Sequence, residues 1–145
     1  MTEVEFHTGV ADVGAFACRL LRKAARQGVR VQVTASAETL EALDRQLWAF
    51  DERDFVPHAR LPGASTAVLE RSPIWLTPQV MGKDAPRVVV NLDQDPPPDL
   101  GALDRLIEVV AADPDQAQRG RERWRAYKAQ GLSIKHHAEP GADRG

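Results

Sequence analysis

Residues 4–33 read VEFHTGVADVGAFACRLLRKAARQGVRVQV, and the spacing of their apolar residues changes twice. Apolar residues first fall at every second position, which predicts a short half-buried strand ending near Gly9. Helical spacing follows, with basic residues between the apolar ones, and predicts an amphipathic helix that Asp12 caps and Gly28 ends. Residues 29–33 alternate again in a β-branched run and predict a second strand. A crossover of this length predicts a right-handed parallel strand, helix, strand unit.

A second helix and several short apolar runs are predicted downstream of this unit. Ser36 can cap a helix whose leucines keep helical spacing up to Trp48 and Phe50. Pro57 cannot donate a hydrogen bond to a sheet, so its segment is expected to be an edge strand or an extended loop. The runs 67–69 and 74–76 fit a strand pair or a strand and a loop, and the run around Val88 to Leu92 fits a buried strand.

The last third of the sequence is predicted to be mostly helical. Residues 103–110 carry an apolar stripe at helical spacing, and Asp113 followed by a proline is typical of the start of another helix. Residues 132–135 predict a short final strand, and residues 138–145 predict a disordered tail. The order of elements predicts one α/β domain, residues 1–137, with a mostly parallel sheet flanked by helices.

Composition excludes several classes of protein. The 145 residues include 19 basic and 21 acidic residues, a net charge of −2, and 43% are hydrophobic. These values exclude a disordered acidic chain and a wholly basic protein that coats nucleic acid. Cys18 is the single cysteine, which fits a reducing cytoplasm. The first residues lack a secretory signal pattern, and no run approaches the roughly 18 apolar residues of a membrane span, so a cytoplasmic protein without membrane contact is expected.

The loop after the first strand does not fit a nucleotide-binding protein. Residues 7–12 lack both the three spaced glycines of a dinucleotide site and the Gly-Lys-Ser/Thr of a phosphate-binding loop. Asp12 would also repel a phosphate. No nucleotide cofactor is therefore expected.

Other catalytic and metal-binding patterns are equally weak. Cys18 lies inside a predicted helix beside core positions, where a thiol is ordinarily inert. His7 and His58 have no His or Cys at metal-ligand spacing, and His136 and His137 are neighbours near the C-terminus. We therefore expect no catalytic residue, no metal site and no enzymatic activity.

One segment concentrates positive charge. Residues 119–135 hold six basic residues and one acidic residue, a net charge of +5, so the rest of the chain carries −7. Arg121, Trp124, Arg125 and Lys128 fall on one face of the predicted helix. Such a face can bind an anionic ligand that also carries an apolar group. Two alternatives remain: the aromatic residues belong to the core while the arginines are solvated, or the face stacks on single-stranded nucleic acid.

Three stretches resemble a known family. Residues 43–48, the sequence FVPH at 55–58 and the sequence RERWRAY at 121–127 resemble the chi subunit of bacterial DNA polymerase III, a clamp-loader accessory subunit. The similarity extends over about residues 3–137. It implies a Rossmann-like fold without a nucleotide, and a non-enzymatic adaptor in DNA replication. The implied partners are the psi subunit and the acidic C-terminal tail of single-stranded DNA-binding protein; a helicase is left open, and DNA contact is mainly indirect.

The resemblance also implies site residues. Those for the acidic tail are Trp48, Arg121, Trp124, Arg125, Lys128, Leu132 and His136, and those for the psi subunit are Phe55 and Val110. One departure concerns Ala117, which stands where the family pattern has a lysine. The alternative function is direct binding of single-stranded DNA through the same basic and aromatic face. A third possible function is that of an enzyme.

Overall fold

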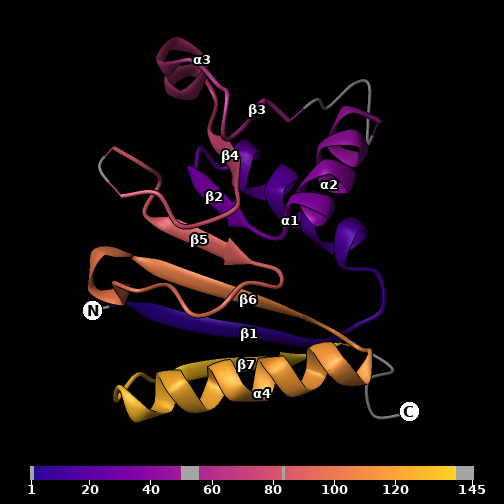
Figure 1. Ribbon diagram of the computed structural model, residues 1–145, viewed down its shortest axis with the longest axis vertical. Helices are drawn as coiled ribbons and strands as arrows, with labels where there is room; N and C mark the ends of the chain where they lie inside the picture. Colours follow the sequence, from indigo (N-terminus) through magenta and orange to yellow (C-terminus); the bar gives the residue numbers. More distant parts are fainter. Residues whose placement is uncertain (1, 50–55, 83, 140–145) are drawn as a thin grey trace.

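The computed structural model describes residues 2–49, 56–82 and 84–139. Its described strands form one parallel sheet of seven, in the order β3-β4-β2-β5-β6-β1-β7, with helices on both faces (Figure 1). The strands are β1 (Glu3–Val10), β2 (Val31–Thr34), β3 (His58–Arg60), β4 (Ile74–Thr77), β5 (Val88–Asn91), β6 (Arg105–Ala111) and β7 (Ile134–Ala138). The helices are α1 (Val13–Arg26), α2 (Ala37–Ala49), α3 (Thr66–Arg71), the 3-10 turn η1 (Leu100–Ala102) and α4 (Pro114–Ala129). The predicted α/β class with a parallel sheet is confirmed.

The predicted strand, helix, strand unit forms, and local chemistry sets the ends of its helix. The Asp12 carboxylate accepts a hydrogen bond from the Ala15 backbone N–H at 3.0 Å, so it caps α1 as predicted. Gly28 follows the helix with φ 71°, a left-handed conformation that glycine adopts without steric cost. Both strands of the unit belong to the sheet, but β5 and β6 lie between β1 and β2.

The helices divide between the two faces of the sheet. Alternate residues of a strand point to opposite faces, and in β6 Ile107 and Val109 pack with α1 and α2 while Leu106 and Val110 pack beneath α4. We call these the α1/α2 face and the α4 face. Figure 1 shows α4 along β7 at one end of the molecule, with α2 and α3 toward the β3 end.

Two predictions of secondary structure were wrong. Residues 103–110, predicted as a helix, form the end of a loop and most of β6, a central strand buried on both faces. A strand covered on both faces is apolar at successive positions, and the polar residues Asp104, Arg105 and Glu108 interrupt this run at intervals that resemble helical spacing. The run 67–69, predicted as strand or loop, lies in α3, where Ser65 accepts a hydrogen bond from the Val68 backbone N–H at 3.3 Å.

Several predicted boundaries are confirmed. Strand β3 begins directly after Pro57 and lies at an edge of the sheet, and Asp113 caps α4 through the Gln116 backbone N–H at 3.2 Å. A final strand is confirmed at the opposite edge, but its bounds differ from the predicted 132–135: β7 spans Ile134–Ala138 and so includes the first residue of the predicted tail. After it, the Glu139 backbone N–H donates to the Thr8 carbonyl at 3.0 Å. Residues 140–145 of the predicted tail lie outside the described residues. No helix in the described part of the chain has the length and apolar character needed to cross a membrane.

Candidate functional site

Helix α4 packs closely on β6 through its inner side. Gly120, Arg123 and Tyr127 are its buried residues. A Cβ atom on Gly120 would lie 2.7 Å from Cγ1 of Val110, so this helix position has room only for glycine. Val110, which the resemblance assigned to the psi surface, is therefore buried beneath α4.

A buried polar network fixes the inner side of α4. The Glu108 carboxylate in β6 accepts hydrogen bonds from Arg123 Nε at 3.0 Å, Tyr127 Oη at 2.5 Å and Asn91 Nδ2 at 3.0 Å. Burial raises the pKa of Glu108, although Arg123 and the hydrogen bonds act in the opposite direction. Burial and the charge of Glu108 raise the pKa of Tyr127 far above its ordinary value, so its hydroxyl stays a donor.

This network is the group of residues that sequence reasoning missed. Arg123 is one of the six basic residues of the segment 119–135, but its side chain is buried and its charge is paired with Glu108 at 3.0 Å. A single acidic residue inside the apolar run of β6 was the available signal for a buried partner. The exposed positive charge of the segment is lower than the sequence count by this one residue.

The outer side of α4 brings together most of the residues predicted for tail binding. Arg121, Arg125 and Lys128 are exposed, and Gln118 Oε1 accepts hydrogen bonds from Arg121 Nη2 at 2.8 Å and Nε at 3.3 Å. Trp124 is half-buried between them, with its indole edge-on to Phe6 at 4.9 Å between ring centroids.

Strand β7 completes this surface. The His136 ring packs edge-on against Trp124 at 5.3 Å, and the Thr8 hydroxyl fixes it through a 2.7 Å hydrogen bond to His136 Nε2. Leu132 is half-buried in the same apolar cluster. We call these six residues the α4 rim: Arg121, Trp124, Arg125, Lys128, Leu132 and His136.

Trp48 is not part of the α4 rim. It lies in the last turn of α2, on the α1/α2 face and near the β3 edge, and its ring packs edge-on against His58 at 5.4 Å. Trp48 is 63% exposed, and His58 is held in place by Asp44 Oδ1 at 2.7 Å from Nε2. The two tryptophans that the resemblance placed in one pocket thus lie on different faces of the sheet. Phe55, predicted for the psi surface, lies outside the described residues.

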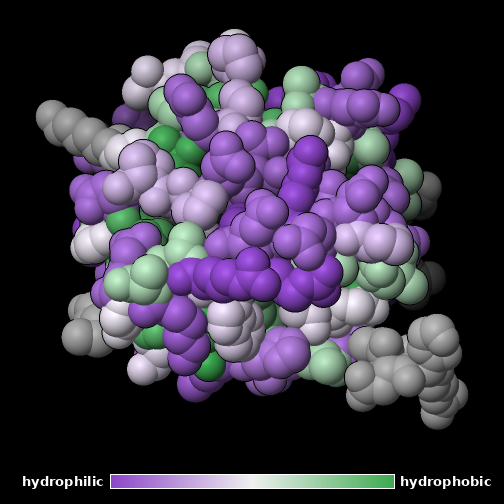
Figure 2. Space-filling model, turned by 60° about the horizontal axis from the view of Figure 1, so that its bottom comes forward, coloured by the Kyte–Doolittle hydropathy of each residue, from purple (hydrophilic) through white to green (hydrophobic). Residues whose placement is uncertain are grey.

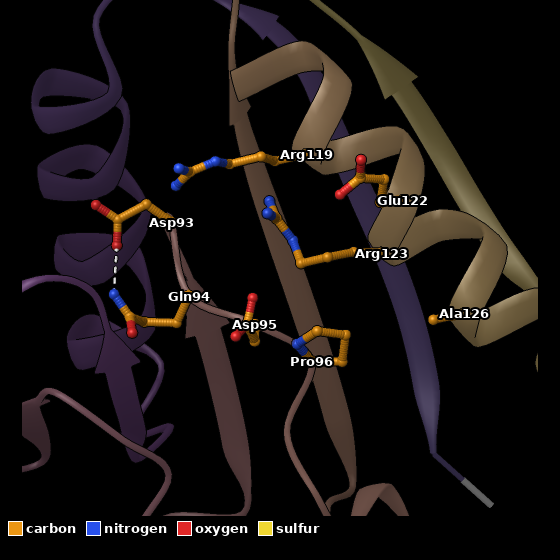
Figure 3. A pocket seen from close by; sticks show the side chains of 8 residues that line it. All are labelled: Asp93, Gln94, Asp95, Pro96, Arg119, Glu122, Arg123 and Ala126. Atoms are coloured by element: carbon orange, nitrogen blue, oxygen red, sulfur yellow. Dashed lines mark hydrogen bonds between the residues drawn. The ribbon is translucent and has the colours of Figure 1, made fainter. Parts of the chain in front are cut away.

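A polar pocket of about 610 Å³ lies between α4 and the loop that follows β5. Its lining residues are Asp93, Gln94, Asp95, Pro96, Arg119, Glu122, Arg123 and Ala126. Arg119 and Arg123 extend from α4 toward that loop (Figure 3), and Arg123 Nη2 is buried without a hydrogen-bond partner among the described residues. Asp93 is already occupied, since it accepts hydrogen bonds from Ser36 and Thr39 of the α2 start. Acidic groups thus offset the arginines in this pocket.

The surface at the α4 end is mainly hydrophilic. Figure 2 turns this end of the molecule forward and shows polar side chains over most of the face, with small apolar areas between them. The α4 rim therefore offers one aromatic side chain among exposed cations, in place of a broad apolar patch. This arrangement fits an anionic partner that buries little apolar area.

Comparison with known proteins agrees with the resemblance seen in the sequence. Residues 1–135 match the family described as DNA polymerase III chi subunit, HolC. The chain is 30% identical to DNA polymerase III subunit chi of Pseudomonas aeruginosa, over 97% of this chain and 99% of that protein. It is 29% identical to DNA polymerase III subunit chi of Haemophilus influenzae, over 81% of each chain.

A solved structure shares the fold alone. The C-terminal domain of S. cerevisiae Dbp5 superposes with a TM-score of 0.64 at 14% identity, over 98% of this chain and 93% of that one. Identity at this level carries no function. The family is shown instead by the match over residues 1–135 and by the two relatives. The chain belongs to the DNA polymerase III chi subunit family, whose members are replication subunits.

Proposed function

We propose that this protein is a non-catalytic adaptor of the DNA polymerase III holoenzyme, which binds the psi subunit and the acidic C-terminal tail of single-stranded DNA-binding protein. The observation that carries the proposal is the α4 rim, where Arg121, Arg125 and Lys128 surround the half-buried indole of Trp124. An acidic peptide that ends in an aromatic residue and a free carboxylate is the chemical complement of that surface. The guanidinium groups pair with carboxylates, and the indole offers an apolar contact.

The positions of the basic residues support this assignment. The position of Ala117, where the family pattern has a lysine, is half-buried and one helical turn before Arg121. Arg121 is exposed, and Gln118 already orients its guanidinium in the free protein. Less side-chain entropy is then lost when a carboxylate binds it. Arg121 is accordingly the proposed main anchor of the tail.

Calorimetric titration with a synthetic tail peptide tests the proposal. Arg121→Ala should weaken binding by about 1–3 kcal/mol, because an incoming carboxylate loses its charged partner. Affinity should also fall as salt rises, since these charges are exposed. Arg19→Ala is the matched control: Arg19 is an exposed arginine on α1, across the sheet, and its loss should leave the affinity unchanged. Absence of binding by the wild-type protein would refute the proposal.

The second candidate is direct binding of single-stranded DNA on the same rim. The exposed arginines favour it, but the Trp124 ring already packs against Phe6 and His136, which limits its use as a stacking platform. The net charge of −7 outside residues 119–135 also opposes it. An oligonucleotide titration separates the two functions, because DNA binding without a protein partner would show a steep salt dependence.

A further inference from the structure

The pairing of β1 with β7 brings together three side chains that are far apart in the sequence. His7 and His137 are direct neighbours in the parallel register, and their rings stack at 4.8 Å with an interplanar angle of 16°. Glu5 lies two residues before His7 and so points to the same face of the sheet. That face is the α1/α2 face, since His7 also packs against Phe16 of α1.

The donor atoms of these three residues have the spacing of metal ligands. Glu5 Oε2 lies 3.3 Å from His7 Nε2, and Glu5 Oε1 lies 3.4 Å from His137 Nε2. One ligand atom from each residue lies within 4.8 Å of the others. Ligands about 2.0–2.1 Å from a tetrahedral zinc ion are about 3.3–3.4 Å from one another. The separation between Glu5 Oε1 and His137 Nε2 already has this value, whereas His7 Nε2 faces the other oxygen of the same carboxylate, Glu5 Oε2.

The surrounding groups are placed as outer partners of a metal site. Arg105 Nη2 lies 2.9 Å from Glu5 Oε2, which leaves Oε1 as the oxygen free to bind an ion. Glu139 Oε1 lies 3.7 Å from His7 Nδ1, the ring nitrogen that carries the proton when Nε2 binds a metal. Metal-bound histidines and carboxylates commonly have such partners, which set their tautomer and orientation.

Burial distinguishes a prepared site from a chance cluster of surface charges. The side chains of Glu5 and His7 are only 14% and 17% exposed, whereas His137 is 51% exposed. Two ligands are thus fixed within the sheet, and the third lies on the solvent side. An ion bound there would have three protein ligands and an open position for water.

We propose that Glu5, His7 and His137 form a binding site for a divalent transition-metal ion of the zinc class. Two imidazole nitrogens and one carboxylate oxygen suit zinc and its neighbours, whereas magnesium and calcium prefer oxygen ligands. The ion would join edge strand β7 to β1. His136, the neighbouring residue, faces the opposite side of the sheet and contacts Trp124 of the α4 rim. The site is independent of the proposed adaptor function.

Titration of the untagged full-length protein with Zn²⁺, followed by calorimetry and by thermal unfolding, tests the site. Wild-type protein should bind one Zn²⁺ and melt at a higher temperature when the ion is present. His137→Ala and Glu5→Gln should each weaken binding by about tenfold or more, because each removes a ligand. Co²⁺ should give the visible absorption of a nitrogen- and oxygen-ligated ion in the wild type, and Mg²⁺ should have no effect.

His136→Ala is the matched control, since it removes a neighbouring histidine of the same strand from the opposite face of the sheet. Its Zn²⁺ affinity should equal that of the wild type. Failure of the wild type to bind Zn²⁺ would overturn the proposal, as would unchanged binding by His137→Ala or loss of binding by His136→Ala. His137 is largely exposed, so its substitution should leave the metal-free protein folded, which circular dichroism checks.

Discussion

Glu108 is a carboxylate at the centre of the sheet, and its surroundings decide how α4 is attached. It is fully buried and accepts hydrogen bonds from three side chains, of which Arg123 and Tyr127 belong to α4. A buried charge is costly unless its partners satisfy it, so the network constrains where α4 can lie on the sheet. The basic and aromatic residues of the α4 rim depend on that placement.

Tyr127→Phe should destabilise the protein by about 1–3 kcal/mol, because the Glu108 carboxylate loses a buried donor. Urea unfolding measures the change. Tail binding by the folded variant should be nearly unchanged, since Tyr127 is buried beneath the helix. Thr8→Val, which removes a hydroxyl bonded to exposed His136, is the control and should change stability by no more than about 0.5 kcal/mol. Equal losses in the two variants would contradict a special role for the network.

Cys18 should react slowly with thiol reagents in the folded protein. Burial, and to a smaller extent the charge of Asp12, raises its pKa from 9.0 to about 11. At pH 8 the folded protein then holds about a hundredfold less thiolate than an unperturbed thiol, because each pKa unit is a factor of ten. Labelling with a disulfide reagent at pH 8, with and without urea, measures the difference. Similar rates in the two conditions would be inconsistent with this burial.

Helix α4 is the element that carries the proposed site, and its contact with β6 is unusually close at Gly120. The helix backbone can lie this close to Val110 because Gly120 has no side chain. An added Cβ at Gly120 would lie 2.7 and 2.9 Å from the two Val110 methyl carbons. A β-branched side chain has little freedom to move away. The distance between helix and strand is therefore fixed by this pair of residues.

Gly120→Ala should destabilise the protein by about 1–3 kcal/mol through overpacking, although alanine is the better helix former by about 1 kcal/mol. The double variant Gly120→Ala with Val110→Ala should recover part of the loss, because the smaller residue in β6 makes room for the new methyl group. A double-mutant cycle from thermal or urea unfolding measures this coupling. Additive effects would show that the two positions do not interact.

On the scale of the whole molecule, the sheet separates two surfaces that the resemblance had combined. The α4 rim lies at the β7 end on one face, while Trp48 lies near β3 on the α2 side. Trp48 is 63% exposed and so is suited to burial by a protein partner. If the proposed partners bind, we therefore expect the acidic tail on the α4 rim and the psi subunit on the Trp48 side.

Tail binding should distinguish the two tryptophans. Trp124→Ala should weaken binding of the tail peptide by about tenfold. Trp48→Ala should change the affinity for the peptide by less than about twofold, since Trp48 lies on the other side of the sheet. Trp48→Ala should instead weaken co-purification with the psi subunit. Because the two surfaces are separate, peptide affinity should be the same with and without bound psi subunit. A large effect of Trp48→Ala on peptide binding would show that one site spans both regions.

Much of the local structure was predictable because it depends on neighbouring residues. Asp12 and Asp113 cap the helices that they were predicted to cap, and Pro57 precedes an edge strand. The exposed arginines of α4 followed from helical spacing alone. Capping and periodicity act within a few residues, so a single sequence contains the information needed for them.

The helix prediction at 103–110 was wrong because the structure of that segment depends on residues far away in the sequence. Whether such a run forms a helix or a central strand depends on which strands pair with it and on what covers its two faces. Here β1 and β5 pair with it, and α1 and α4 cover its faces. The burial of Arg123 also depends on tertiary structure. Its position in the helix does not reveal that β6 brings Glu108 beneath it.

The sequence by itself determined the α/β class, the ends of the main helices and the family resemblance that points to a replication adaptor. Only the tertiary structure decided that Arg123 is buried, that Trp48 and Trp124 are apart, and that His7 lies beside His137. The physical reason is the order of the strands. Parallel pairing joins segments more than a hundred residues apart, and neither composition nor local spacing specifies which strands become neighbours.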